Sequence, residues 1–76
     1  MRKDRYVGKW IYIDFFCYSK SGKTEIYQVM SDRGEHLGDI KWFAPWRKYA
    51  FFPESNTLYE GDCLGDIVRF LESLKK

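Results

Sequence analysis

Helical periodicity is confined to the end of this 76-residue sequence. Apolar residues there recur three and four positions apart, which is the spacing of one face of an amphipathic α-helix. The stripe consists of Leu64, Ile67, Val68, Leu71 and Leu74. A single helix can cover one face of a sheet and leaves the other face for solvent, a second copy or a partner.

The residues before the helix have the pattern of short strands separated by turns. Gly22 and Gly34 supply the positive φ that tight turns between strands need, and Pro45 interrupts a strand because proline cannot donate to a ladder. The predicted strands are 9–18, 24–31, 37–43 and 47–52, with 57–59 as a brief edge strand. We therefore predict an α+β fold, an antiparallel meander of three to five strands with one C-terminal helix packed on one face.

One domain accounts for the whole chain, because 76 residues are close to the lower limit for independent folding. We expect a frayed N-terminal segment at 1–8, the meander at 9–59 and the helix at 61–75. Asp62 is the predicted helix N-cap, and Asp66 adds negative charge to the first turn.

Alternation along the first strand predicts which side chains face the core. One register is wholly apolar and is assigned to the core: Ile11, Ile13, Phe15 and Cys17. The other register contains Asp14 and is assigned to the uncovered face: Trp10, Tyr12, Asp14, Phe16 and Tyr18. With this assignment, Cys17 is buried and four aromatic rings face outward.

Aromatic residues number fifteen, and twelve of them lie within 6–18 and 42–52. A domain this small cannot easily hide so much ring surface. In the second stretch Lys41, Arg47 and Lys48 alternate with the rings. This arrangement resembles the platforms of single-strand binders, where rings stack on bases and cations contact phosphates. It also suits a core hairpin whose cations reach solvent, which is the commoner arrangement.

Charge gives modest support to a polyanionic partner. The net charge is +2, with ten Lys/Arg against six Asp/Glu in residues 1–50 and three against five in 51–76. We predict a small non-enzymatic binding module with nucleic acid as the favoured partner. The alternative is a protein–protein module, either a homodimer or a phage or mobile-element adaptor or inhibitor. The expected contacts are Trp10, Tyr12, Phe16 and Tyr18 for stacking, and Lys41, Arg47 and Lys48 for phosphates.

Catalytic, metal and cofactor sites are not expected. Gly22-Lys23-Thr24 resembles the end of a P-loop, but the full pattern needs a glycine where Cys17 stands. His36 is the sole histidine and has no zinc-ligand spacing around it. Cys17 and Cys63 form no CxxC pair, so we expect two reduced, unreactive thiols in a cytoplasmic protein without a membrane span.

Two patterns in the last forty residues carry a resemblance. They are Gly38-Asp39-Ile40-Lys41-Trp42 with the segment 46–53, and then Cys63-Leu64 with Ile67. Together they are similar to small bacterial and phage-borne proteins of uncharacterised function that share G-[DE]-I-K-W, W-R-x-Y-x-F-F-P and a C-L-x-x-I helix. The resemblance implies a bacterial or mobile-element origin and assigns no site residues.

Overall fold

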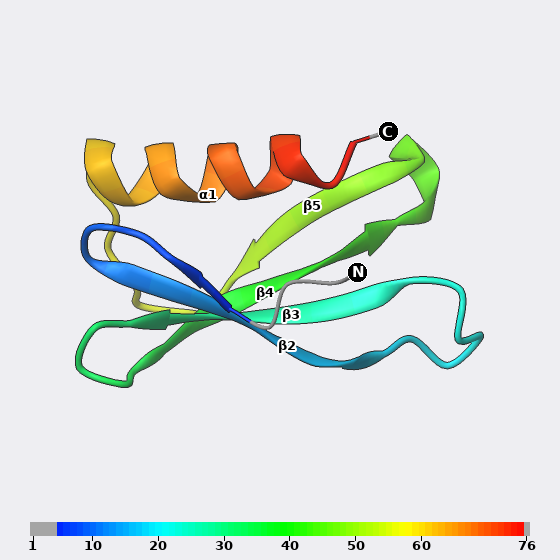
Figure 1. Cartoon of the computed structure of the whole chain (residues 1–76), viewed down its shortest axis with the longest axis horizontal. Coiled ribbons are helices and arrows are strands. Elements are labelled where there is room, and N and C mark those ends of the chain that lie inside the picture. The colour runs from blue at the N-terminus through cyan, green and yellow to red at the C-terminus, as the bar shows by residue number, and fades with distance from the viewer. Residues whose placement is uncertain (1–4, 76) are drawn as a thin grey trace.

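The computed structural model describes residues 5–75, which form one sheet and one α-helix (Figure 1). The strands are β1 Arg5–Val7, β2 Ile11–Tyr18, β3 Glu25–Ser31, β4 His36–Phe43 and β5 Lys48–Pro53, with a short 3-10 helix, η1 Ala44–Trp46, before β5. They pair in sequence order β1-β2-β3-β4-β5, and every pair is antiparallel. The helix α1 spans Gly61–Ser73. The predicted α+β meander with a C-terminal helix is confirmed.

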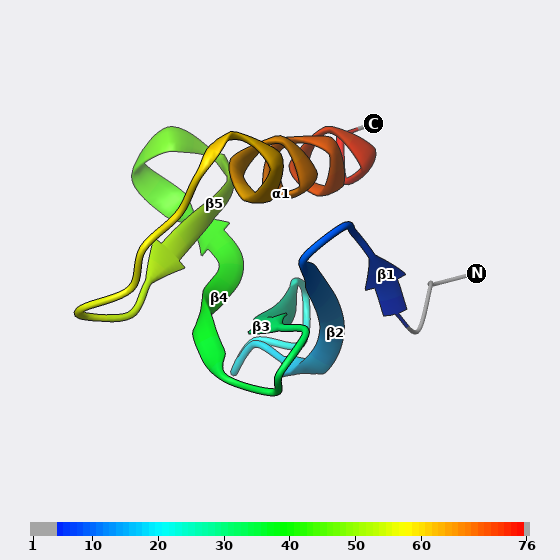
Figure 2. The same ribbon diagram turned by 90° about the vertical axis from the view of Figure 1, so that its left-hand side faces the viewer.

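The sheet is curved into a trough, and α1 lies along its open side (Figure 2). In that view β3 forms the bottom of the trough, while β1 and β5 rise on either side toward the helix. One helix is narrow for a trough of five strands. The remaining space must be filled by large side chains.

Aromatic rings fill that space. The buried core consists of Ile11, Ile13, Tyr27, Val29, Ile40, Ile67 and Phe70. Phe70 of α1 packs edge-on against Tyr27 of β3, with ring centroids 4.9 Å apart, and against Tyr6 of β1, at 5.8 Å. Edge-to-face pairs at these separations are favourable beyond the area they bury. Phe70 therefore joins the edge strand β1 and the central strand β3 to the helix.

The apolar stripe of α1 lies about one position away from the predicted one. Cys63, Ile67, Phe70, Leu71 and Leu74 pack against the sheet, whereas Leu64 and Val68 are exposed. The prediction chose the wrong edge of the stripe because apolar residues occupy both edges.

The helix also begins differently from the prediction. Glu60 is the N-cap and accepts a hydrogen bond from the Asp62 amide at 2.9 Å, so the predicted Asp62 cap is wrong. Asp66 lies beyond the first turn and is buried.

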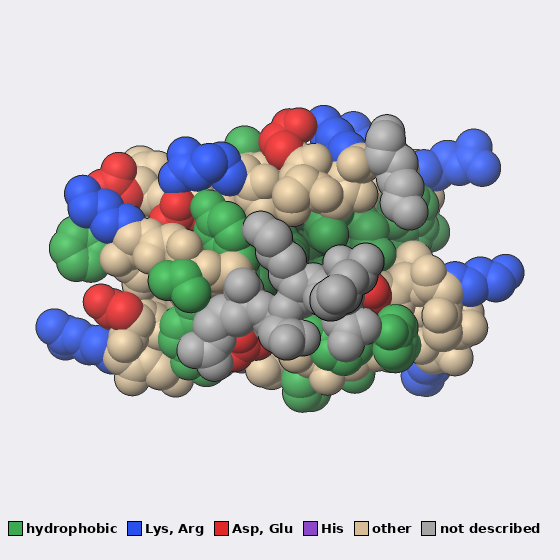
Figure 3. Space-filling view, in the orientation of Figure 1, with side chains coloured by type: hydrophobic (Ala, Val, Ile, Leu, Met, Phe, Trp, Pro, Cys, Tyr) green, Lys and Arg blue, Asp and Glu red, His purple; other side chains and the backbone are tan. Residues whose placement is uncertain are grey.

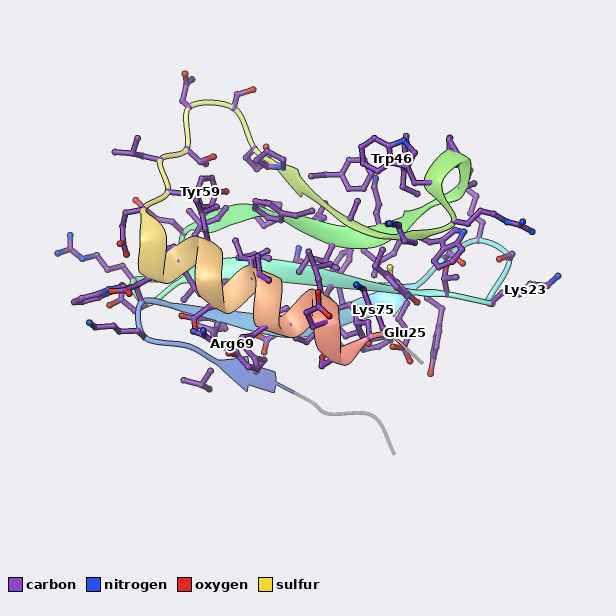
Figure 4. All side chains as sticks on the ribbon, turned by 90° about the horizontal axis from the view of Figure 1, so that it is seen from above. Lys23, Glu25, Trp46, Tyr59, Arg69 and Lys75 are labelled. Carbon is purple, nitrogen blue, oxygen red and sulfur yellow. The ribbon has the colours of Figure 1, made fainter. Side chains whose placement is uncertain are left out.

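The edges of the meander differ from the prediction in two places. Residues 5–7, expected to be frayed, form β1, whereas residues 1–4 lie outside the described part of the chain. Residues 57–59 form no strand. Instead, the Tyr59 hydroxyl donates to the Leu37 carbonyl at 2.6 Å and fixes the connection from β5 to α1 (Figure 4).

Asp66 ties the N-terminal segment to the helix. Its carboxylate accepts from the Lys9 amide at 2.9 Å, from the Arg69 guanidinium and, at 3.5 Å, from the Tyr6 hydroxyl. Burial alone would raise the pKa of Asp66, but the Lys9 amide and the Arg69 guanidinium outweigh it and lower the pKa below its ordinary value. The carboxylate is therefore charged and satisfied at neutral pH.

Gly38 is a position where a side chain should destabilise the sheet. A Cβ there would lie 2.5 Å from the Phe52 carbonyl oxygen and 2.9 Å from the Pro53 Cα, both in the paired strand β5. We expect Gly38→Ala to cost about 1–3 kcal/mol, measured as a lower urea midpoint. Gly65→Ala is the matched control, because no neighbour crowds that Cβ closely and alanine favours a helix interior. A Gly38→Ala protein as stable as the parent would contradict this packing.

Candidate nucleic-acid interface

The seven residues predicted to form one binding face lie on different parts of the molecule. The register places Tyr12 and Lys41 on the face away from α1, Tyr18 on the face toward α1, and Arg47 and Lys48 at the end of the β4–β5 hairpin. Trp10 lies in the bend before β2. The expectation of one continuous outer face is therefore wrong.

A β-bulge in β2 explains the placement of Tyr18. Phe15 is opposite Tyr27, whereas Cys17 is opposite Ile26, so Phe16 is an extra residue in β2. Such a bulge reverses the faces of the residues that follow it. Tyr18 consequently returns to the helix side, and its ring packs against Phe15 with centroids 5.1 Å apart. Cys17 moves to the outer face, so its predicted place in the core is wrong.

The middle of the outer face of the sheet is a poor surface for a polyanion. Cross-strand pairing places Asp14, Gln28 and Asp39 in one row across β2, β3 and β4. Two carboxylates therefore occupy the middle of the face on which we expected stacked bases. Trp10 shares a shallow surface depression with Glu60 and Asp62, and the Lys9 Nζ, which pairs with Asp62, lies 5.5 Å from the centroid of its ring.

A cleft lies instead at one end of the trough. Its volume is about 1050 Å³, and its walls are the ends of the β2–β3 and β4–β5 hairpins and the C-terminal turn of α1. The residues that line it include Tyr18, Lys23, Glu25, Tyr27, Trp42, Arg47, Lys48, Tyr49, Phe70, Leu71, Leu74 and Lys75. A space of this size is at the upper end of the range for small-ligand sites.

Two rings on different hairpins remain accessible in the cleft. Tyr18 of β2 is 52% exposed and Trp42 of β4 is 41% exposed. Trp42 packs edge-on against Tyr49, with centroids 5.4 Å apart and an interplanar angle of 82°. Each ring therefore packs against a neighbouring ring and still offers area to a ligand. Tyr27 and Phe70 are buried and belong to the core beneath.

Hydrogen bonds around Glu25 hold the wall of the cleft that β3 and β5 form. The Glu25 amide donates to the Tyr49 hydroxyl at 3.2 Å, which joins β3 to β5. The Tyr27 hydroxyl donates to the Glu25 carboxylate. The two hairpins are therefore connected at the cleft, and its shape is largely formed before any ligand binds.

Cations outnumber carboxylates around the cleft. Lys23, Arg47, Lys48 and Lys75 line it, and Glu25 is the acidic residue among the lining side chains. Within residues 5–75, Lys75 forms an exposed ion pair with Glu72 at 3.3 Å, while no ion pair involves Lys23, Arg47 or Lys48. The C-terminal end of α1 adds roughly half a negative charge, which Lys75 offsets.

This distribution is visible on the molecular surface. Figure 3 shows lysine and arginine side chains projecting at the end formed by the hairpin tips, whereas acidic side chains accompany the basic ones at the opposite end. Figure 4 shows Lys75 and Glu25 near the end of α1, with Lys23 projecting beyond them. The cleft therefore combines accessible rings with a positively charged rim.

The reactive side chains of His36 and Cys63 do not line the cleft. His36 contacts the carboxylates of Asp39 at 2.8 Å and Glu54 at 3.4 Å, on the outer side of β4. Burial raises the pKa of the Cys63 thiol, so this cysteine is a poor nucleophile at neutral pH. Residues 5–75 contain no group of three His, Cys, Asp or Glu side chains placed to hold a metal ion.

Comparisons with protein-family models, with curated proteins and with solved structures found no match to this chain. Among the helices in the described range, none has the length and apolar character needed to cross a bilayer.

Of the residues that line the cleft, the sequence predicted Tyr18, Arg47 and Lys48 as site residues. Among those it did not assign to a site are Lys23, Trp42, Tyr49 and Lys75. The alternation of β4 already placed Trp42 on the same face as Ile40, which was a usable signal. Lys23 and Lys75 gave none, because the cleft exists only where a turn and a helix end meet.

Proposed function

We propose that this protein is a non-enzymatic module that binds single-stranded nucleic acid in the cleft. Tyr18 and Trp42 would stack on bases, while Arg47, Lys48 and Lys23 would contact phosphates. The observation that carries the proposal is that half-exposed rings lie beside Lys23, Arg47 and Lys48, none of which forms an ion pair within residues 5–75. Base stacking with backbone contacts is how single-strand binders act without reading sequence.

A single strand suits this cleft better than a duplex does. Bases in a duplex are stacked on each other and cannot reach rings recessed between two hairpins. Duplex binding also relies on many phosphate contacts, whereas this rim offers few cations. We also propose a cytoplasmic location, with Cys17 and Cys63 as free thiols.

Salt dependence of binding tests the proposal. The logarithm of the association constant for a fluorescent oligothymidylate should fall linearly with the logarithm of the salt concentration. Replacing both Arg47 and Lys48 with glutamine should reduce the magnitude of that slope by about 1.4, since each single-strand phosphate contact contributes about 0.7. The matched control replaces Lys9 and Arg33, which do not line the cleft, and should leave the slope unchanged. Binding without any salt dependence would contradict the proposal.

Trp42→Ala should weaken oligonucleotide binding by about 1–3 kcal/mol, because one stacked base is lost. Trp10→Ala is the matched control, since that ring has similar exposure but lies in the bend before β2. Anisotropy titrations measure the affinity, and thermal melts confirm that both variants are folded. Equal affinities of the two variants for the oligonucleotide would show that the oligonucleotide does not bind in the cleft.

A protein–protein module remains the second candidate function. Leu64 and Val68 are exposed four residues apart on α1, and such a pair can contribute to the apolar centre of an interface. A homodimer through this surface would show twice the chain mass in sedimentation and little sensitivity to salt.

A further inference from the structure

A second aromatic cluster lies on the other side of the β4–β5 hairpin. We call Phe43, Trp46 and Phe52 the outer platform. Phe43 contacts Trp46 with ring centroids 4.8 Å apart and Phe52 with centroids 6.0 Å apart. Trp46 is 65% exposed. The platform therefore offers ring surface of the kind found in the cleft.

The hairpin end holds Trp46 in a defined position. Pro45 lies in η1, and Arg47 adopts the left-handed conformation with φ 54°, while its amide donates to the carbonyls of Phe43 and Ala44 at 3.0 Å each. These constraints limit the rearrangement of the turn. Figure 4 shows Trp46 at this end of the molecule, on the β5 side of the sheet.

Cations lie beside the platform and connect it to the cleft. The Lys41 Nζ lies 4.8 Å from the centroid of the Phe52 ring. Lys48 is opposite Phe43 in the sheet register and also lines the cleft, and Arg47 lines the cleft directly after Trp46. A polyanion leaving the cleft over this hairpin would thus meet positive charge and then the exposed ring of Trp46.

We propose that a bound single strand continues from the cleft over the end of the β4–β5 hairpin and stacks on Trp46. This inference rests on the proposed function and extends it: the ligand is an oligonucleotide of several residues, and a mononucleotide or dinucleotide fills the cleft alone. Lys41 holds a phosphate of the outer portion, and Lys48 lies where the strand passes from the cleft to the platform. Asp39 is opposite Phe52 in the sheet register, but Lys41, Arg47 and Lys48 outnumber this carboxylate around the platform. This charge favours an oligonucleotide over an apolar protein segment.

The length dependence of affinity tests the inference. Trp46→Ala should reduce the affinity for an octathymidylate roughly tenfold and leave the affinity for a dithymidylate unchanged. Trp42→Ala should weaken both ligands, because its ring lies in the cleft. Trp46→Tyr, which keeps a ring, should retain most of the octamer affinity. Thermal melts of the Trp46 variants should match the parent, since the side chain is largely exposed.

The possible failures are distinguishable. If no oligonucleotide binds the parent protein, both the proposed function and this extension are wrong. If oligonucleotides bind and respond to Trp42→Ala while Trp46→Ala binds the octamer as the parent does, only the extension is overturned. If Trp46→Ala lowers the affinity for the dithymidylate as much as the affinity for the octathymidylate, the extension is also overturned, because Trp46 would then belong to the cleft. If Trp46→Ala instead converts a dimeric parent to a monomer with octamer affinity unchanged, the platform is a protein interface.

Discussion

Replacing Phe70 with alanine should lower the free energy of unfolding by about 3–5 kcal/mol, the largest effect expected of any single substitution considered for this protein. Phe70 is 5% exposed and is the ring through which α1 contacts both Tyr27 and Tyr6. Its removal would leave a cavity between the helix and the sheet. A domain of this size has a total stability of about 4–11 kcal/mol, so much of that stability would be lost.

Urea unfolding followed by circular dichroism measures this effect. Val68→Ala is the matched control, because Val68 is on the same helix and is 53% exposed. It should change stability by about 0.5 kcal/mol or less. If both variants had the same midpoint as the parent, α1 would not be docked on the sheet as described.

Asp66→Ala should be the second most damaging change, with an expected cost of about 2–4 kcal/mol. The substitution removes the acceptor of the Lys9 amide and the anionic partner of Arg69. Within residues 5–75 the Lys9 amide donates to no other group, so water would have to accept its hydrogen bond after the substitution. Asp62→Ala is the matched control, since its exposed ion pair with Lys9 should contribute little.

The pH dependence of stability should reveal the same carboxylate. The folded-state pKa of Asp66 lies below the ordinary value, so its stabilising contribution is fully present above the unfolded pKa of about 3.9 and is lost as pH falls through the folded pKa. The difference in urea midpoint between the parent and Asp66→Asn should therefore shrink as the pH is lowered below about 4. A difference that stays constant with pH would show that the charge of Asp66 is not what stabilises the fold.

Local patterns were sufficient to predict β2 to β5 and α1 in their order along the chain. The glycines at the two turns have φ values of 75° for Gly22 and 88° for Gly34, as tight turns between strands require. Pro45 separates β4 from β5 as expected. These features depend on neighbours in sequence, which is why the sequence reveals them.

Features set by contacts between distant segments were not predictable. Both registers of β2 are rich in apolar and aromatic residues. A change of face within the strand therefore places no strongly polar residue in the core, and the sequence pattern does not reveal the bulge at Phe16. The helix stripe was ambiguous for the same reason, because Leu64 and Val68 are as apolar as Cys63 and Phe70. In each case pairing and packing across the fold decide between two acceptable local patterns.

The aromatic excess has two origins that the sequence did not separate. Several rings fill the trough beneath a single helix: Tyr6, Phe15, Tyr27, Tyr49, Phe51, Tyr59 and Phe70. Others are exposed at the hairpin ends, among them Tyr18, Trp42 and Trp46. The expectation that surplus rings face a partner therefore becomes a proposal about the second group alone.

Amide and indole NMR shifts during titration with a short single-stranded oligonucleotide test the central claim most directly. The proposed site predicts that the largest changes fall on Tyr18, Trp42, Arg47, Lys48 and Tyr49, with progressive loss of these changes as salt is raised. The backbone around Asp14 and Gln28 should change little, because these residues lie in the middle of the outer face, away from the end of the β4–β5 hairpin. Changes centred on Asp14 and Gln28 or on Leu64 and Val68, or no changes at any oligonucleotide concentration, would contradict the assignment of the cleft.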